Sequence, residues 1–173
     1  RWGASGSVST SHKLNTDRWY HLAVIFKDNQ VKLYVDGINV GTASATNPKN
    51  VSHPFLVGAM FKDNKQDKPQ NLFNGWIEEV RVWDTSLTNE QLRFLMNQRV
   101  KLNSNPLRGN VLPLDVPGTL QWTNLLGYYR MIGETVVDGM TLDEADNKAH
   151  GELRNINTTQ ENTAPLPYVS VQD

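Results

Sequence analysis

The most regular alternation of apolar and polar residues lies in WYHLAVIFKDNQVKLYVDG, residues 19–37. Leu22, Val24 and Phe26 occupy every second position of the first half, and the alternation resumes at Val31 after the polar residues KDNQ. A period of two places alternate side chains on one face of a strand. The stretch therefore predicts a β-hairpin that rests one face on a core.

Asp36 and Gly37 end this hairpin. Asp-Gly favours a type I′ turn because both central residues of that turn need a positive φ. We therefore expect a second tight turn at this point and a third strand near 38–44. A role for Asp36 as a metal ligand or catalytic acid is the weaker interpretation.

Two further apolar runs predict strands, PFLVGAM at 54–60 and LFNGWIEEVRVWD at 72–84. In the second run the alternation changes phase after Ile77. One extra residue in a strand reverses the facing of everything that follows it. The phase change therefore predicts a β-bulge near Glu78 and Glu79.

The stretch SLTNEQLRFLMNQ departs from the period of two. Leu92 and Leu95 recur at helical spacing, and Thr88 is followed three residues later by Gln91. Thr and Gln at that spacing form a capping box at a helix N-terminus. The sequence therefore predicts one short α-helix near 88–98.

The order of these motifs resembles the laminin G-like and pentraxin-like modules. The matching motifs are Trp19 with HLAV, LYVDG, FNGWIEEVRVWD and SLTNEQL, and together they cover about residues 17–98. The resemblance implies an all-β fold, an antiparallel jelly-roll sandwich of the concanavalin A-like kind. In that family these motifs lie in the second half of the domain, so we expect the chain to be a fragment that starts mid-domain.

The chain divides into three expected parts. Residues 1–100 are the C-terminal half of the laminin G-like sandwich, and residues 101–121, which contain three prolines, are an ordered crossing or linker. Residues 122–173 either close the same sandwich or begin a second repeat. Closing the sandwich is favoured, because about fifty residues alone bury too little core.

The trailing part carries a resemblance of its own. Residues 125–156 are similar to a segment that opens or follows such modules in bacterial surface proteins. NTAPLPYVS, at 162–170, resembles a stretch of very large secreted adhesins of gliding bacteria, some of them exported by the type IX pathway. This resemblance implies a secreted or cell-surface protein.

Composition narrows the classes of partner. The 173 residues are 38% hydrophobic and 20% charged, as in an ordinary globular chain, and the net charge of -1 gives no reason to expect binding to nucleic acid or to an anionic membrane. No apolar run is long enough to insert into a bilayer, and the lack of cysteine excludes disulfides and thiolate metal sites. The expected partners are a glycan or an extracellular protein, and neighbouring domains of the same polypeptide.

The resemblance also implies a possible cofactor, calcium, in the loop 61–71. Pentraxin-like modules hold calcium there with acidic residues and with a Gln just before the next strand. The candidates here are Asp63, Asp67 and Gln70, with Asn64 as an extra oxygen donor, and calcium takes six to eight such oxygens. Three lysines in the loop would oppose a cation, so a solvated polar loop stays open as the alternative.

A second group of oxygen donors precedes the sequence HGEL. It consists of Asp138, Asp143, Asp146 and Asn147. Asp and Asn side chains also stabilise turns by bonding to nearby backbone groups, so turn formation is the plainer interpretation.

Catalytic groups are not expected. A retaining glycoside hydrolase needs two carboxyl groups about 5 to 5.5 Å apart, whereas adjacent residues such as Glu78 and Glu79 point to opposite faces of a regular strand. Of the tryptophans, Trp76 is expected to pack on a sheet, whereas Trp2 and Trp122 flank irregular segments and could stack on a sugar ring.

Three function classes follow from the sequence. A non-catalytic binding or adhesion module of a large surface protein is favoured, because the resemblance concerns structural residues and no paired acid and base is visible. A purely structural spacer domain is the runner-up, and a glycoside hydrolase of the same fold is third. The fold cannot choose among them, since function lies in sites placed on folds.

Overall fold

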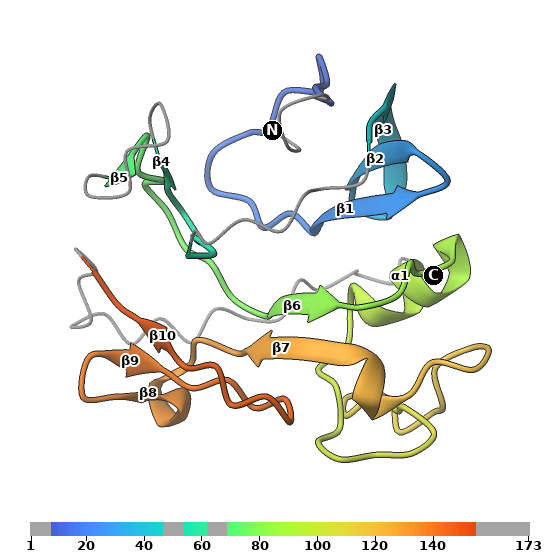
Figure 1. Ribbon diagram of the computed structural model, residues 1–173, viewed down its shortest axis with the longest axis vertical. Helices are drawn as coiled ribbons and strands as arrows, with labels where there is room; N and C mark the ends of the chain where they lie inside the picture. The colour runs from blue at the N-terminus through green and yellow to red at the C-terminus, as the bar shows by residue number, and fades with distance from the viewer. Residues whose placement is uncertain (1–7, 47–53, 62–68, 155–173) are drawn as a thin grey trace.

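Antiparallel β-strands make up most of the regular structure (Figure 1). The computed structural model describes residues 8–46, 54–61 and 69–154. Its strands are β1 (Leu22–Lys27), β2 (Gln30–Val35), β3 (Ile38–Ser44), β4 (Met60–Phe61), β5 (Pro69–Gln70), β6 (Val80–Trp83), β7 (Leu125–Tyr129), β8 (Val136–Val137), β9 (Met140–Thr141) and β10 (Gly151–Glu152). Its helices are α1 (Asn89–Leu95) and the short 3₁₀ turns η1 (Trp122–Asn124) and η2 (Gly133–Thr135). The predicted all-β, antiparallel class with one short helix is confirmed.

The strands pair into small antiparallel sheets. Strands β1, β2 and β3 form one three-stranded sheet, and β8, β9 and β10 form another. Strand β4 pairs with β5, and β6 pairs with β7. The pairing of β6 with β7 joins the trailing part of the chain to residues 80–83 by backbone hydrogen bonds.

The first sheet follows the sequence pattern closely. Asp28 and Asn29, between β1 and β2, have φ angles of 51° and 55°, and Asp36 and Gly37, between β2 and β3, have φ angles of 48° and 72°. Paired positive φ angles are those of type I′ turns, whose twist matches that of the flanking strands. The three predicted strands and both tight turns are therefore confirmed.

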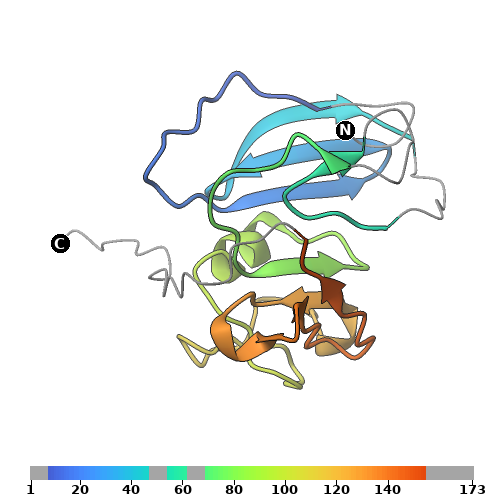
Figure 2. The ribbon, with the colours of Figure 1, turned by 90° about the vertical axis from the view of Figure 1, so that its left-hand side faces the viewer.

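The two faces of this sheet differ. On the apolar face Val31 is fully buried, but Leu22 and Val24 are about half exposed, so the described residues cover only part of the predicted core face. The opposite face carries Lys32 and Tyr34 of β2 and lies against helix α1, as Figure 2 shows. The Tyr34 hydroxyl donates a hydrogen bond to Asn89 Oδ1 over 3.0 Å, which fixes the start of the helix to the sheet.

Two predicted strands are shorter in the structure. In 54–60 only Met60 belongs to a strand, since Gly58 has a φ of 73° that interrupts extended backbone. The expected strand over 73–84 is reduced to β6, which begins directly after Glu79 at φ 59°. The expected bulge at Glu78 and Glu79 is wrong, because the left-handed residue there ends the irregular segment instead of interrupting a ladder.

Helix α1 has the predicted capping box. The Thr88 hydroxyl accepts from the Gln91 backbone N–H, and the Gln91 side chain accepts from the Thr88 backbone N–H. The helix ends at Leu95, three residues before the predicted end. The Leu95 carbonyl accepts from the Gln98 backbone N–H over 3.2 Å and from Arg81 of β6 over 2.8 Å, so a tighter backbone bond and a side chain satisfy it where the helix ends.

The main hydrophobic core lies after the first sheet in sequence. It consists of Leu95, Val100, Leu107, Val116, Leu120, Trp122, Leu125, Tyr128 and Ala145. Three of these side chains come from the proline-containing stretch 101–121, so that stretch is packed against its neighbours. The division of the chain into a half sandwich, a crossing and a trailing segment stays a prediction.

Candidate functional site

The predicted calcium ligands divide between described and undescribed residues. Asp63 and Asp67 lie outside the described residues. Gln70 is exposed in β5, where it pairs with Met60 of β4 at the base of the loop 61–71. The calcium site at these residues stays a prediction.

The second group of oxygen donors serves the backbone. Asp143 is 1% exposed, and its Oδ1 accepts from the backbone N–H groups of Tyr128 and Ala145 over 2.8 and 3.0 Å. Its Oδ2 accepts from the Ala149 N–H over 3.0 Å. A carboxylate with three backbone donors organises the turn that follows β9, as the plainer interpretation predicted.

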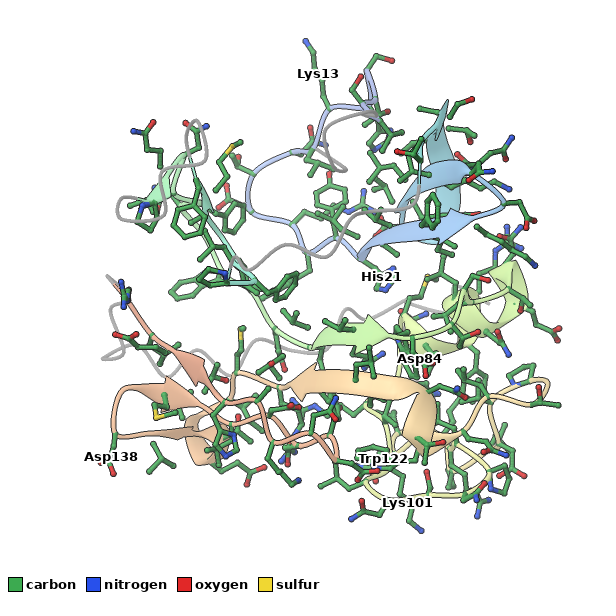
Figure 3. All side chains as sticks on the ribbon, viewed as in Figure 1. Lys13, His21, Asp84, Lys101, Trp122 and Asp138 are labelled. Atoms are coloured by element: carbon green, nitrogen blue, oxygen red, sulfur yellow. The ribbon has the colours of Figure 1, made fainter. Side chains whose placement is uncertain are left out.

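The other members of that group point to separate partners. Asp138 has a φ of 51° in the turn between β8 and β9, and Figure 3 shows it at the far end of that hairpin. Asp146 accepts from the Trp122 indole, and Asn147 donates to the Leu126 carbonyl. Within residues 8–46, 54–61 and 69–154, no three His, Cys, Asp or Glu side chains are grouped as a metal site requires.

Glu78 and Glu79 lie together, against the expectation of opposite faces. Arg99 Nη2 lies 3.0 Å from Glu78 Oε1, and Arg99 Nε lies 3.7 Å from Glu79 Oε1. The pleat that would separate the two side chains begins only at Val80, so the positive φ of Glu79 allows both to reach one guanidinium. The two side chains are 13% and 16% exposed, so solvent reaches little of either carboxylate.

Arg81 completes this group, which we call the arginine–glutamate cluster (Glu78, Glu79, Arg81 and Arg99). Arg81 Nη2 lies 2.5 Å from Glu79 Oε2 and also donates to the Gln98 carbonyl. Tyr128 donates from its hydroxyl to Glu79 Oε2 over 2.9 Å. Burial raises the pKa of Tyr128, so this hydroxyl keeps its proton and remains a donor. Two carboxylates and two guanidinium groups balance in charge where β6, β7 and the end of α1 meet.

His21 lies just before β1 and points toward β6 (Figure 3). Its backbone N–H donates to Asp36 Oδ1, and the Asp36 N–H donates to the His21 carbonyl, each over 2.8 Å. Burial, together with the nearby Arg81 guanidinium, lowers the pKa of His21 to about 4. The imidazole is therefore neutral at pH 7.

Trp122 is a core residue and is not available to stack on a sugar ring. Trp122 is 5% exposed, and its indole N–H donates to Asp146 Oδ1 over 2.9 Å, so the expectation that it stacks on a sugar is wrong. Burial with a satisfied N–H is typical of a core tryptophan. Trp76 is 49% exposed and lies outside the strands, and Trp2 lies outside the described residues.

The structure reveals a hollow that the sequence did not suggest. It has a volume of about 240 Å³ and lies between the polar face of β1 and β2 and the start of α1. Lys27 and Lys32 line it together with Ile25, Tyr34 and Leu87. Strand alternation places the lysines on one face, but only the packing of α1 on that face makes a hollow there.

Comparison with known families identifies the superfamily of the chain. The sequence profile of the concanavalin A-like lectin/glucanases superfamily matches residues 1–93. The chain therefore belongs to the concanavalin A-like lectin/glucanases superfamily. This membership confirms the laminin G-like and concanavalin A-like part of the resemblance.

Comparison with solved structures gives a partial match. The chain is similar to an S-layer domain-containing protein (residues 221–444) from Clostridium thermocellum ATCC 27405, with 24% sequence identity and a TM-score of 0.41. The match covers 50% of this chain and 42% of that chain, so it spans less than half of the solved structure. Comparison with curated proteins gives no match. In the part of the chain that the structure describes, no helix has the length and apolar character needed to cross a membrane.

Proposed function

We propose that the chain is a binding module that holds its ligand without cleaving it. Its superfamily includes lectins, which bind sugars, and glucanases, which cleave them, so membership alone does not choose between the two. The choice between binding and cleavage depends on whether carboxyl groups are free to take part in hydrolysis.

The observation that carries the proposal is the bonding of Glu78 and Glu79. In a retaining hydrolase one carboxyl group gives a proton to the leaving oxygen while the other attacks the sugar. Here Arg99 binds both carboxylates, and Arg81 and Tyr128 also bind Glu79. Carboxylates that are held by guanidinium groups and shielded from solvent serve as structural links, which supports binding over cleavage.

The proposal includes a place outside the cell. Residues 125–156 resemble a segment found beside such modules in bacterial surface proteins, and residues 162–170 resemble a stretch of long secreted adhesins, in which modules are joined in series. Modules in series turn weak single contacts into strong attachment, because the second contact becomes intramolecular. We place the chain in a secreted or cell-surface protein for this reason, with glycans or extracellular proteins as ligands and calcium at Asp63, Asp67 and Gln70 as a cofactor.

An array of glycans and matrix proteins, probed with the chain and run beside turnover assays on polysaccharides, tests the proposal. We expect binding to at least one class of ligand and no turnover. Turnover that disappears in Glu78→Gln or Glu79→Gln would contradict the proposal. Failure to bind any ligand, with or without calcium, would favour the structural spacer.

A further inference from the structure

The hollow beside α1 has an uncompensated positive charge. Lys27 and Lys32 are the charged side chains that line it. Lys27 of β1 pairs directly with Gln30 of β2, and Lys32 of β2 pairs with Ile25 of β1. The two lysines are therefore diagonal neighbours on one face of the sheet, a relation that places Cα atoms about 7 to 8 Å apart. Within the described residues neither ammonium group forms an ion pair, so the pair of cations leaves room for an anion between them.

The acidic side chains closest in sequence do not cancel this charge. Asp28 lies in the turn after β1, and Glu90 lies in the first turn of α1. Neither of them lines the hollow. An anion in the hollow therefore meets two ammonium groups without a competing carboxylate.

The remaining walls suit a sugar ring better than a bare ion. Ile25 and Leu87 present apolar surface, and Tyr34 of β2, which also lines the hollow, is almost completely buried. The Tyr34 hydroxyl donates to Asn89 Oδ1, which fixes the side-chain amide of Asn89 at the rim. Apolar walls with a few fixed polar groups are typical of sites for organic ligands. The volume of about 240 Å³ is small for such a site and suits a single sugar residue.

We propose that this hollow, formed by Lys27, Lys32, Ile25, Tyr34, Leu87 and Asn89, binds an anionic sugar that carries a carboxylate or sulfate group. The apolar walls hold the C–H face of the ring, and the two lysines bind the acid group. The inference rests on the proposed binding function and names the ligand class of one site.

Titration calorimetry on the whole chain at low ionic strength tests this inference. The probes are carrageenan oligosaccharides, which carry sulfate, oligogalacturonates, which carry carboxylate, and neutral agarose oligosaccharides. We expect at least one anionic probe to bind, the neutral probe to bind much more weakly, and added salt to weaken binding. The probe that binds identifies the acid group as sulfate or carboxylate.

Charge variants locate the site. Lys27→Gln and Lys32→Gln should each weaken the binding roughly tenfold or more, as expected for loss of one charged hydrogen bond. Lys32→Arg should retain most of it. Lys101→Gln is the matched control, because it removes the same charge from an exposed lysine on another segment, and it should leave the affinity unchanged.

The outcomes separate this inference from the proposed function. Unchanged affinity in both Gln variants, an equal loss in Lys101→Gln, or equal binding of the neutral probe would overturn the inference. If the chain and its lysine variants bind a neutral glycan or a matrix protein equally well, the binding function stands and only this site is wrong. If the chain binds no ligand at all, both fail.

Discussion

Asp143 shows how one residue type can suit two very different roles. In the sequence it stands among four oxygen donors that could hold calcium. In the structure its carboxylate accepts three backbone N–H groups and is almost completely buried. Which donors reach a carboxylate depends on β7 and on residues 145–149 folding around it, so the sequence could give only the alternatives.

His21 makes the stability of the chain depend on pH. Its pKa is about 4 in the folded chain and about 6.5 in the unfolded chain, so on acidification the unfolded state binds the proton first. The contribution of neutral His21 to the free energy of unfolding is fully present above about pH 6.5. It decreases as the pH falls, and about 3 kcal/mol of it is lost by pH 4. Urea unfolding at several pH values measures this loss.

Two variants isolate the contribution of His21 from that of the carboxylates. His21→Gln should lack the part of the acid destabilisation that the imidazole causes, so its stability should fall less steeply than that of the wild type below pH 6.5. His12→Gln, at an exposed position, should follow the wild type. Parallel pH profiles for the wild type and His21→Gln would contradict the assignment.

At the scale of elements, features that depend on neighbouring residues were predicted correctly from the sequence, whereas features that depend on distant residues were not. Two turns with paired positive φ and the capping box of α1 depend on neighbouring residues, and the structure has them where the sequence placed them. The strand expected over 73–84 depends on pairing with distant residues, and β7 pairs only with Val80–Trp83. The contact of Glu78 and Glu79 with Arg99 also joins residues about twenty positions apart, which no local pattern indicates.

The capping box should contribute measurably to helix α1. Thr88→Ala removes the hydroxyl that accepts the Gln91 N–H, and we expect a loss of about 1 kcal/mol in the free energy of unfolding. Thr88→Ser keeps a hydroxyl and should restore most of that loss. Thr85→Ala, at an exposed position before the helix, is the control, and an equal effect there would show that the cap is not the cause.

The arginine–glutamate cluster should hold β6 to the end of α1. Arg81→Met leaves Glu79 short of one cation and removes the guanidinium bonds to the Leu95 and Gln98 carbonyls, of which Leu95 keeps only the Gln98 backbone N–H as a donor. We therefore expect a loss of about 3 kcal/mol or more in chemical unfolding.

A second substitution tests the electrostatic cause. Adding Glu79→Gln to Arg81→Met removes the unbalanced charge and should recover part of the stability. Arg154→Met, which removes an exposed arginine, should leave the unfolding midpoint unchanged. Strictly additive effects of Arg81→Met and Glu79→Gln would rule out coupling within the cluster.

At the scale of the whole molecule, the superfamily was predictable and the hollow was not. Motifs in a fixed order identify a family even when some predicted strands are shorter in the structure, because the motifs mark turns and packing positions. The hollow exists because α1 packs on the lysine-bearing face of the first sheet, which a single sequence does not reveal. In the sequence, its two lysines are simply polar residues in an alternating strand pattern, and nothing there indicates that they line a hollow.

Calcium should stabilise the chain through the loop 61–71. Titration with calcium should release or absorb heat and raise the melting temperature, and Asp63→Ala and Asp67→Ala should weaken both effects. A bound ion should lie about 2.3 to 2.6 Å from its oxygen ligands. Asp115→Ala, at an exposed ion pair, is the control. No heat and no thermal shift at millimolar calcium would favour the spacer interpretation.

The central claim is that the chain binds a sugar and leaves it intact. The most direct test is a mass spectrum of an oligosaccharide that has been bound by the chain, held at equilibrium and then recovered. We predict that the bound sugar returns with its original mass, because arginines hold Glu78 and Glu79 and the proposed function gives these carboxylates a structural role. Shorter sugars that appear with the wild type and not with Glu78→Gln would contradict the claim.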